Sequence, residues 1–170
     1  MLFPFEAVSF ENNFEDAHSN LDISKQLVNT LYGIINYTKW EKNVDQSTVP
    51  INICVVNECP VSSTIKLQKP DTKYAWWPNL IFLDDGSEVQ NKNCDVLYFG
   101  STFDNVQLSD INLKNDNILT ISDQKDFIKN GGFIELKKEA GNVKFSINSD
   151  TINEKNFSLD SELIQIGIDK

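Results

Sequence analysis

Short apolar runs alternate with helical patterns between residues 51 and 121, and this alternation constrains the fold more than any other feature. Four runs are each long enough for one strand: 51–56, 80–83, 94–99 and 118–121. The first contains a single polar residue, Asn52, which is typical of a strand that is covered on both faces. Strand–helix–strand repeats form right-handed crossovers. We therefore expect an α/β domain with a mainly parallel central sheet and short helices on both faces.

The segment 118–168 predicts how the domain ends. A short helix should follow the last parallel strand and stop at Gly131-Gly132, because glycine readily adopts the left-handed conformation of a helix cap. Residues 133–136 and 143–147 alternate in polarity around a turn sequence, which indicates a β-hairpin. A closing helix is expected from Ser158. The domain should thus end in a C-terminal β-hairpin plus a helix.

Ahead of the strands, apolar residues recur at helical spacing from Asp22, and the helix should end near Tyr37 to Trp40. Asn20 or Asp22 could cap its start. Residues 1–20 are polar with scattered Phe, so we expect a loosely packed lead-in followed by a single domain over 21–170. A chain of 170 residues can bury about 70% of its unfolded surface.

The charge of the chain argues against two classes of partner. The net charge is −10, and all fifteen basic residues are Lys. A nucleic-acid binder needs a basic face, and Arg forks to read guanine, so no nucleic acid is expected as a partner. No apolar run reaches the roughly 18 residues that span a membrane, so no direct membrane insertion is expected. Residues 1–6 lack the regions of a signal peptide, so the leader of an exported protein would be absent from this sequence.

No set of residues points to catalysis, a metal or a cofactor. His18 is the only histidine and falls in the polar lead-in, where a base cannot be held rigidly against a nucleophile. One His and three scattered Cys do not build a zinc site. Residues 84–88 contain part of a calcium-loop pattern but lack its spacing, so a capped turn is expected there. Carboxylate pairs for hydrolysis depend on the fold, and the sequence favours none.

Cysteine placement leaves two readings open. Cys54 and Cys94 lie in separate predicted strands, and neighbouring strands bring Cα atoms within disulfide range. They could equally be two buried thiols, since Cys is among the most buried residue types. Cys59 has no evident partner.

The sequence around Tyr74, Trp76 and Trp77 is the one feature with a plausible binding role. Adjacent side chains on an extended segment point to opposite faces, so one Trp could pack inward while the other anchors a partner or ligand. The alternative is that both Trp side chains cover an edge of the core, since large aromatic side chains are mostly buried.

Several motifs, in order, resemble the YfiR-like family of bacterial periplasmic regulators. They cover roughly residues 24–168 and are Ile35-Asn36-Tyr37-Thr38-Lys39-Trp40, Ile51-Asn52-Ile53-Cys54-Val55-Val56, Cys94-Asp95-Val96-Leu97-Tyr98-Phe99 and the 118–168 segment with its Gly pair and Val-x-Phe-x-Ile-Asn strand. The chain departs from the family at Cys59-Pro60-Val61 and Trp77-Pro78, where a "Pro-Phe-Gly" turn and a "Gly-x-Pro" sequence are usual.

The resemblance implies a function that the residues alone do not. Similar proteins bind the periplasmic domain of an inner-membrane diguanylate cyclase and repress it, which lowers cyclic di-GMP signalling and biofilm formation. It further implies a periplasmic protein that is not an enzyme, a homodimer, and a bridge between Cys54 and Cys94, which match family cysteines. The alternative is a periplasmic module that binds a small molecule or peptide and has no cyclase partner.

Overall fold

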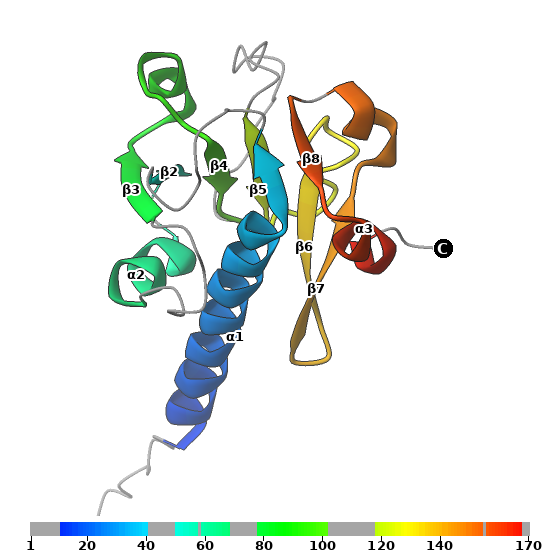
Figure 1. Ribbon diagram of the computed structural model, residues 1–170. Coiled ribbons are helices and arrows are strands. Elements are labelled where there is room, and N and C mark those ends of the chain that lie inside the picture. The colour runs from blue at the N-terminus through cyan, green and yellow to red at the C-terminus, as the bar shows by residue number, and fades with distance from the viewer. Residues whose placement is uncertain are drawn as a thin grey trace, which may run out of the picture.

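The computed structural model describes residues 11–40, 50–57, 59–68, 78–101, 118–154 and 156–167, and a six-stranded sheet forms its centre (Figure 1). The strands lie in the order β3-β2-β4-β5-β6-β7. Every neighbouring pair is parallel except the β6–β7 hairpin. The strand bounds are β2 (Ile51–Val56), β3 (Pro78–Leu83), β4 (Val96–Phe99), β5 (Leu119–Ser122), β6 (Ile134–Glu139) and β7 (Asn142–Ile147). The predicted α/β class and mainly parallel sheet are confirmed.

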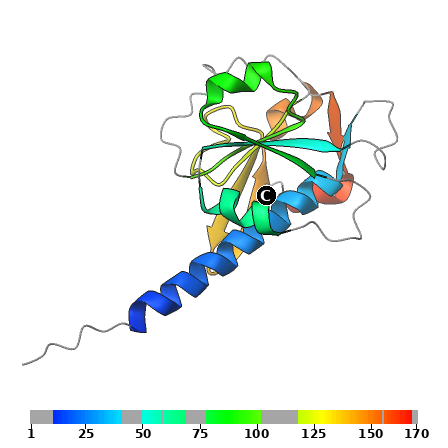
Figure 2. The same ribbon diagram turned by 90° about the vertical axis from the view of Figure 1, so that its left-hand side faces the viewer.

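The sheet is covered on both faces. Figure 2 shows α1 (Glu11–Asn36) and α2 (Pro60–Leu67) on one face and the 3-10 helix η1 (Gly86–Asn91) on the other. Alternate side chains of β2 pack into the two hydrophobic cores on either face of the sheet. Ile53 and Val55 pack in the larger core beneath α1, and Val56 packs in the smaller core beneath η1. Burial on both faces explains why the strands read as continuous apolar runs. The segment between β4 and β5, residues 102–117, lies outside the described residues.

A second, two-stranded sheet was not predicted. β1 (Thr38–Trp40) pairs antiparallel with β8 (Phe157–Leu159), which follows the 3-10 helix η2 (Ser149–Glu154). The closing helix α3 (Ser161–Gly167) therefore begins three residues later than expected, because the backbone of Ser158 is paired with Lys39. The same pairing makes Thr38–Trp40 a strand, and α1 therefore ends at Asn36.

Helix α1 begins at Glu11, earlier than its apolar pattern indicates. Residues 11–20 thus belong to the helix, whereas the apolar pattern placed its start near Asp22. Apolar residues at helical spacing mark only the part of a helix that is buried. A polar sequence can extend the helix beyond that part. Figure 2 shows these first turns extending away from the sheet. Residues 1–10 lie outside the described residues.

The hairpin and the glycine pair follow local backbone rules. Ala140 and Gly141 both have positive φ, 47° and 79°, as the tightest hairpin turn requires. Consecutive turns replace the helix expected before Gly131. Asp126, within these turns, has a φ of 62°, which a helix does not allow. Gly131 has a φ of 94°, and Gly132 lies against the Phe127 ring, where a Cβ would come within 2.2 Å of a ring carbon. The glycine pair is therefore needed for conformation and for space.

Candidate functional site

The carboxyl edge of the parallel strands is where this sheet should bind its ligands. The first parallel strand, β2, has its successor β3 on one side and β4 on the other, which makes a topological switch point. Open α/β sheets bind ligands beside the carboxyl ends of strands at such a point. Cys59 follows β2, Ser101 follows β4 and Asp123 follows β5, so these three residues gather at that edge.

Asp123 is the centre of a buried polar network at this edge. Its side chain is only 3% exposed. Its Oδ1 accepts hydrogen bonds from the Tyr98 hydroxyl at 2.7 Å and from the Ser101 N–H at 2.9 Å, and its Oδ2 lies 2.8 Å from Lys138 Nζ. Tyr98 is fully buried, and this burial, aided by the Asp123 charge, raises the pKa of its hydroxyl well above the usual value. The network therefore holds three sheet elements, β4, β5 and β6, in fixed positions.

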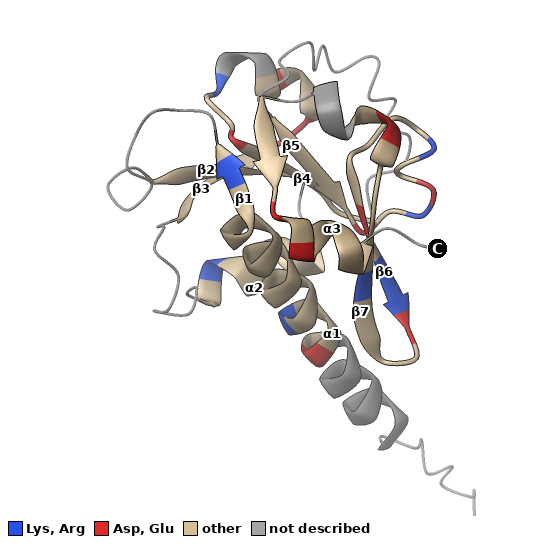
Figure 3. Ribbon diagram, turned by 45° about the vertical axis from the view of Figure 1, so that its right-hand side comes forward, with Lys and Arg blue, Asp and Glu red and all other residues tan. Residues whose placement is uncertain are grey.

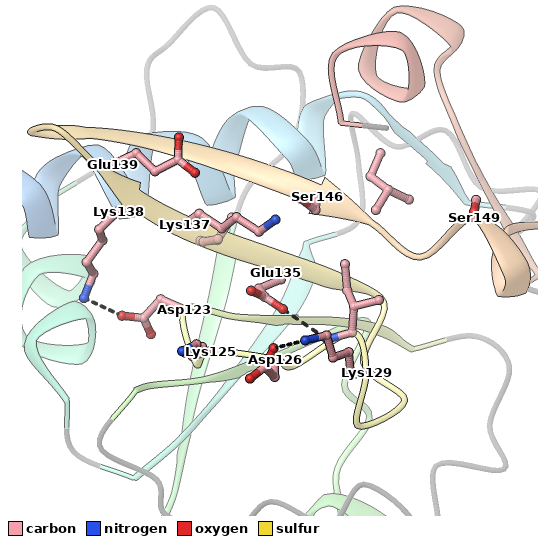
Figure 4. A pocket seen from close by; sticks show the side chains of 13 residues that line it. Asp123, Lys125, Asp126, Lys129, Glu135, Lys137, Lys138, Glu139, Ser146 and Ser149 are labelled. Carbon is pink, nitrogen blue, oxygen red and sulfur yellow. Dashed lines mark hydrogen bonds and ion pairs between the residues drawn. The ribbon is translucent and has the colours of Figure 1, made fainter. Parts of the chain in front are cut away.

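A polar pocket of about 660 Å³ lies beside Asp123, between the 123–129 turn and the β6–β7 hairpin (Figure 4). Side chains on the hairpin face opposite α1, such as Glu135 and Ser146, contribute to one wall, and the turn supplies the other. Figure 3 shows basic residues along this hairpin. The polar pocket is lined by Asp123, Lys125, Asp126, Ile128, Lys129, Glu135, Leu136, Lys137, Lys138, Glu139, Ser146, Ile147 and Ser149.

Charges of both signs line the polar pocket and are largely paired. Figure 4 shows Lys138 reaching Asp123, and Lys129 reaching Asp126 at 2.6 Å. The hydrogen bond that Lys129 donates to Asp126 lowers the pKa of the Asp126 carboxyl and raises the pKa of the Lys129 ammonium. Glu135 is buried, and its Oε2 accepts from the Ile128 N–H at 3.3 Å. A lowered carboxyl pKa opposes a role as general acid, and paired charges suit recognition of a polar ligand better.

Cys54 and Cys94 form a disulfide, with 5.7 Å between their Cα atoms. Cys54 lies in β2, and Cys94 lies just before β4, the neighbouring strand. Both residues are buried in the core beneath η1, away from the polar pocket. The disulfide alternative is therefore confirmed. The bridge links β2 to the segment before β4, two neighbouring strands at the centre of the sheet.

Cys59 is a free and buried thiol. It forms the N-cap of α2, where its N–H donates to Ser62 Oγ at 3.0 Å and Ser62 Oγ donates back to its carbonyl at 2.7 Å. Burial raises the pKa of the Cys59 thiol, and its hydrogen bonds to Ser62 and Val61 oppose this shift. A raised pKa disfavours a nucleophile, so the residue fits a structural role.

The other residues singled out from the sequence can be placed only in part: Tyr74, Trp76 and Trp77 lie outside the described residues, and so does the side chain of His18. The 84–88 sequence forms a capped turn, as expected, because Asp85 Oδ1 accepts from the Ser87 N–H at 2.6 Å. Among the residues that the structure describes, no cluster of three potential metal ligands occurs. No helix within that part of the chain is long and apolar enough to cross a membrane.

Sequence reasoning missed a second surface, the α1–α2 groove. This groove has a volume of about 440 Å³ and is lined by Leu21, Lys25, Asn29, Ser63, Thr64, Leu67 and Gln68. Leu67 is 87% exposed and Leu21 is 47% exposed. Both belong to sequences with helical patterns, and only the packing of the two helices shows that they share a groove.

A family model described as YfiR/HmsC-like matches residues 24–167 of the chain. The matched range begins in α1 and ends with α3. A search of curated proteins gave no match.

Proposed function

This chain belongs to the YfiR/HmsC-like family, and on that premise we propose that it is a non-catalytic periplasmic regulator. It binds the periplasmic domain of a membrane-bound diguanylate cyclase and represses the enzyme, so that cyclic di-GMP signalling falls. The observation that carries this proposal is the family match over residues 24–167, which includes the strands of both sheets and the polar pocket.

The disulfide supports the proposed compartment. Bridges such as Cys54–Cys94 form and persist in oxidising environments, among them the bacterial periplasm, and are rare in the cytosol. The bridge connects β2 to the segment that precedes β4, and it joins residues that are 40 positions apart in sequence. Such a link stabilises a fold mainly by constraining the unfolded chain, which suits a protein that works outside the cytosol.

The proposed mechanism is a shift of populations. A regulator that binds the inactive conformation of the cyclase more tightly than the active one draws the enzyme into the inactive state. No chemistry by the regulator is required, and the extent of repression is limited by the difference in affinity between the two states.

Capture of the cyclase tests this function. The folded chain, immobilised, is incubated with envelope extract of its own bacterium, with and without reductant, and bound proteins are identified by mass spectrometry. The proposal expects a diguanylate cyclase with a periplasmic domain among them, and direct binding of that purified domain afterwards. Absence of binding by the purified domain would overturn it. Sedimentation of the same sample tests the homodimer that family membership leads us to expect.

The polar pocket favours a second candidate function, binding of a small polar molecule or peptide without a cyclase partner. Its volume of about 660 Å³ is within the range of ligand sites, and it presents carboxylates and ammonium groups together. Thermal shift assays with amino acids and short peptides would detect such a ligand, and Lys137→Ala should reduce the shift. A transporter or receptor gene beside this one would favour this function, whereas a cyclase gene would favour the first.

A further inference from the structure

We propose that the α1–α2 groove is the surface that docks the partner, and that it takes an amphipathic helix whose apolar face is flanked by acidic side chains. The identity of the partner, the periplasmic domain of the cyclase, rests on the proposed function. The choice of surface rests on four features of the groove.

The first feature is its shape. Leu21, Lys25 and Asn29 are spaced four residues apart and form one stripe along α1. Leu67 and Gln68 stand at the end of α2, which packs beside α1. Two adjacent helices leave a channel between them into which the ridge of a third helix fits. Helix-in-groove docking uses such a channel, with side chains at i, i+3 and i+4 as anchors.

The second feature is the exposure of apolar side chains. The surface of the groove is mainly apolar. Leu67 has the highest exposed fraction of any large hydrophobic residue in the described part of the chain, and Leu21 faces the same groove. By contrast, the apolar stripe of α1 that packs on the sheet is fully buried at Leu27 and Leu31. Exposed leucines that share one concave surface are typical of an interaction site.

The third feature is an acceptor without a partner. Gln68 Nε2 donates to Asn29 Oδ1, and the Gln68 carbonyl accepts from the Tyr32 hydroxyl at 3.3 Å. Gln68 Oε1 is buried, yet within the described residues it has no hydrogen-bond partner. A buried acceptor without a partner destabilises the fold, because it has lost its hydrogen bonds to water. Gln68 lines the groove, so a rotation of its side chain would bring this acceptor to a hydroxyl, amide or indole donor on a docked helix.

The fourth feature is charge. The chain carries a net charge of −10, but among the described residues Lys25 is the only charged one that lines the groove. A second copy related by a two-fold axis would present the same patch to itself and bring Lys25 toward its own counterpart, with no acidic residue among the described lining residues to offset it. A different protein with acidic side chains beside its apolar face complements the groove better.

Affinity of the purified cyclase domain for the folded chain and its variants tests the docking surface. Leu67→Glu should weaken binding at least tenfold, since it places a charge in the apolar contact. Ile166→Glu on α3 is the matched control: Ile166 is 73% exposed, and Figure 1 shows α3 and α2 well apart, so affinity should stay within about twofold. Lys25→Glu should also weaken binding, with a smaller dependence on salt than the wild type shows.

Each result has a distinct meaning. Circular dichroism and the urea midpoint first establish that Leu67→Glu folds like the wild type. If the wild type binds and Leu67→Glu binds equally well, the groove is not the docking surface and the proposed function stands. If the wild type does not bind the domain, the proposed function and this inference both fail. If sedimentation shows a wild-type dimer that Leu67→Glu dissociates, a second copy occupies the groove and the inference is overturned.

Discussion

Lys138 on strand β6 lies 2.8 Å from Asp123 at the carboxyl end of β5, measured from Nζ to Oδ2. The two side chains differ in environment: that of Lys138 is 44% exposed, and that of Asp123 is 3% exposed. The pair joins the C-terminal hairpin to the edge of the parallel sheet and closes one end of the polar pocket. Removal of the buried Asp123 carboxylate should therefore cost more stability than removal of the half-exposed Lys138 ammonium.

Asp123→Ala should destabilise the fold by about 2–4 kcal/mol. The substitution leaves the buried Tyr98 hydroxyl and the Ser101 N–H without their acceptor. Urea unfolding measures the change. Asp126→Asn is the matched control in the same turn, because asparagine tolerates the φ of 62° and the lost ion pair is exposed. Equal losses of about 1 kcal/mol or less for both variants would contradict the role assigned to Asp123.

The Cys54–Cys94 bridge should contribute about 3–4 kcal/mol, the loop-closure value for residues 40 apart. Reductant should therefore lower the unfolding midpoint of the wild type. A Cys54→Ala, Cys94→Ala double variant should be less stable from the outset and insensitive to reductant. The bridge would be unimportant for stability if reductant left the wild-type midpoint unchanged once mass spectrometry had shown complete reduction.

Two glycine-to-alanine substitutions should change the stability of the fold in opposite directions. Gly132→Ala places a Cβ within 2.2–2.7 Å of the Phe127 ring, so a loss of about 1–3 kcal/mol is expected. Gly33→Ala lies in α1, where a Cβ meets nothing within 4 Å, and should stabilise the fold by about 0.5–1 kcal/mol. Thermal unfolding compares the two, and a stabilised Gly132→Ala would show that the close packing is not maintained in solution.

Stability should fall as the pH rises above 10. Burial raises the pKa of Tyr32 from 10.0 to about 12, so the unfolded chain loses this proton first. The contribution is complete below pH 10 and is lost as the pH approaches 12, at about 1.4 kcal/mol per unit. Unfolding measured at pH 9 and pH 11 should therefore show a smaller decline for Tyr32→Phe than for the wild type. Identical declines for Tyr32→Phe and the wild type would contradict the assignment.

The central sheet was predictable because burial on both faces leaves continuous apolar runs in the sequence. Ile51–Val56 and Val96–Phe99 could be recognised as strands without any partner in view. The pairing of β1 with β8 could not, since each strand has three residues and their register joins Thr38 to Leu159 across most of the chain. The start of α1 was misplaced because its first ten residues carry no apolar stripe.

The site was less predictable than the fold. Lysines and carboxylates such as Lys138 and Glu135 look like ordinary surface residues in an acidic chain, and only the fold brings them around one pocket. One signal was available: Asp123 comes directly after a buried strand, at the edge where α/β sheets bind ligands. The disulfide was one of two alternatives from the residues, and strand adjacency decides between them. The aromatic contacts proposed at Tyr74, Trp76 and Trp77 stay a prediction.

The cyclic di-GMP level of cells tests the central claim most directly. A membrane-bound diguanylate cyclase with a periplasmic domain is produced with and without the exported chain, beside a matched cyclase that lacks this domain. We predict that the chain lowers cyclic di-GMP with the intact cyclase and has no effect on the truncated one. Equal cyclic di-GMP with and without the chain, at equal amounts of intact cyclase and with direct binding absent, would contradict the proposed function.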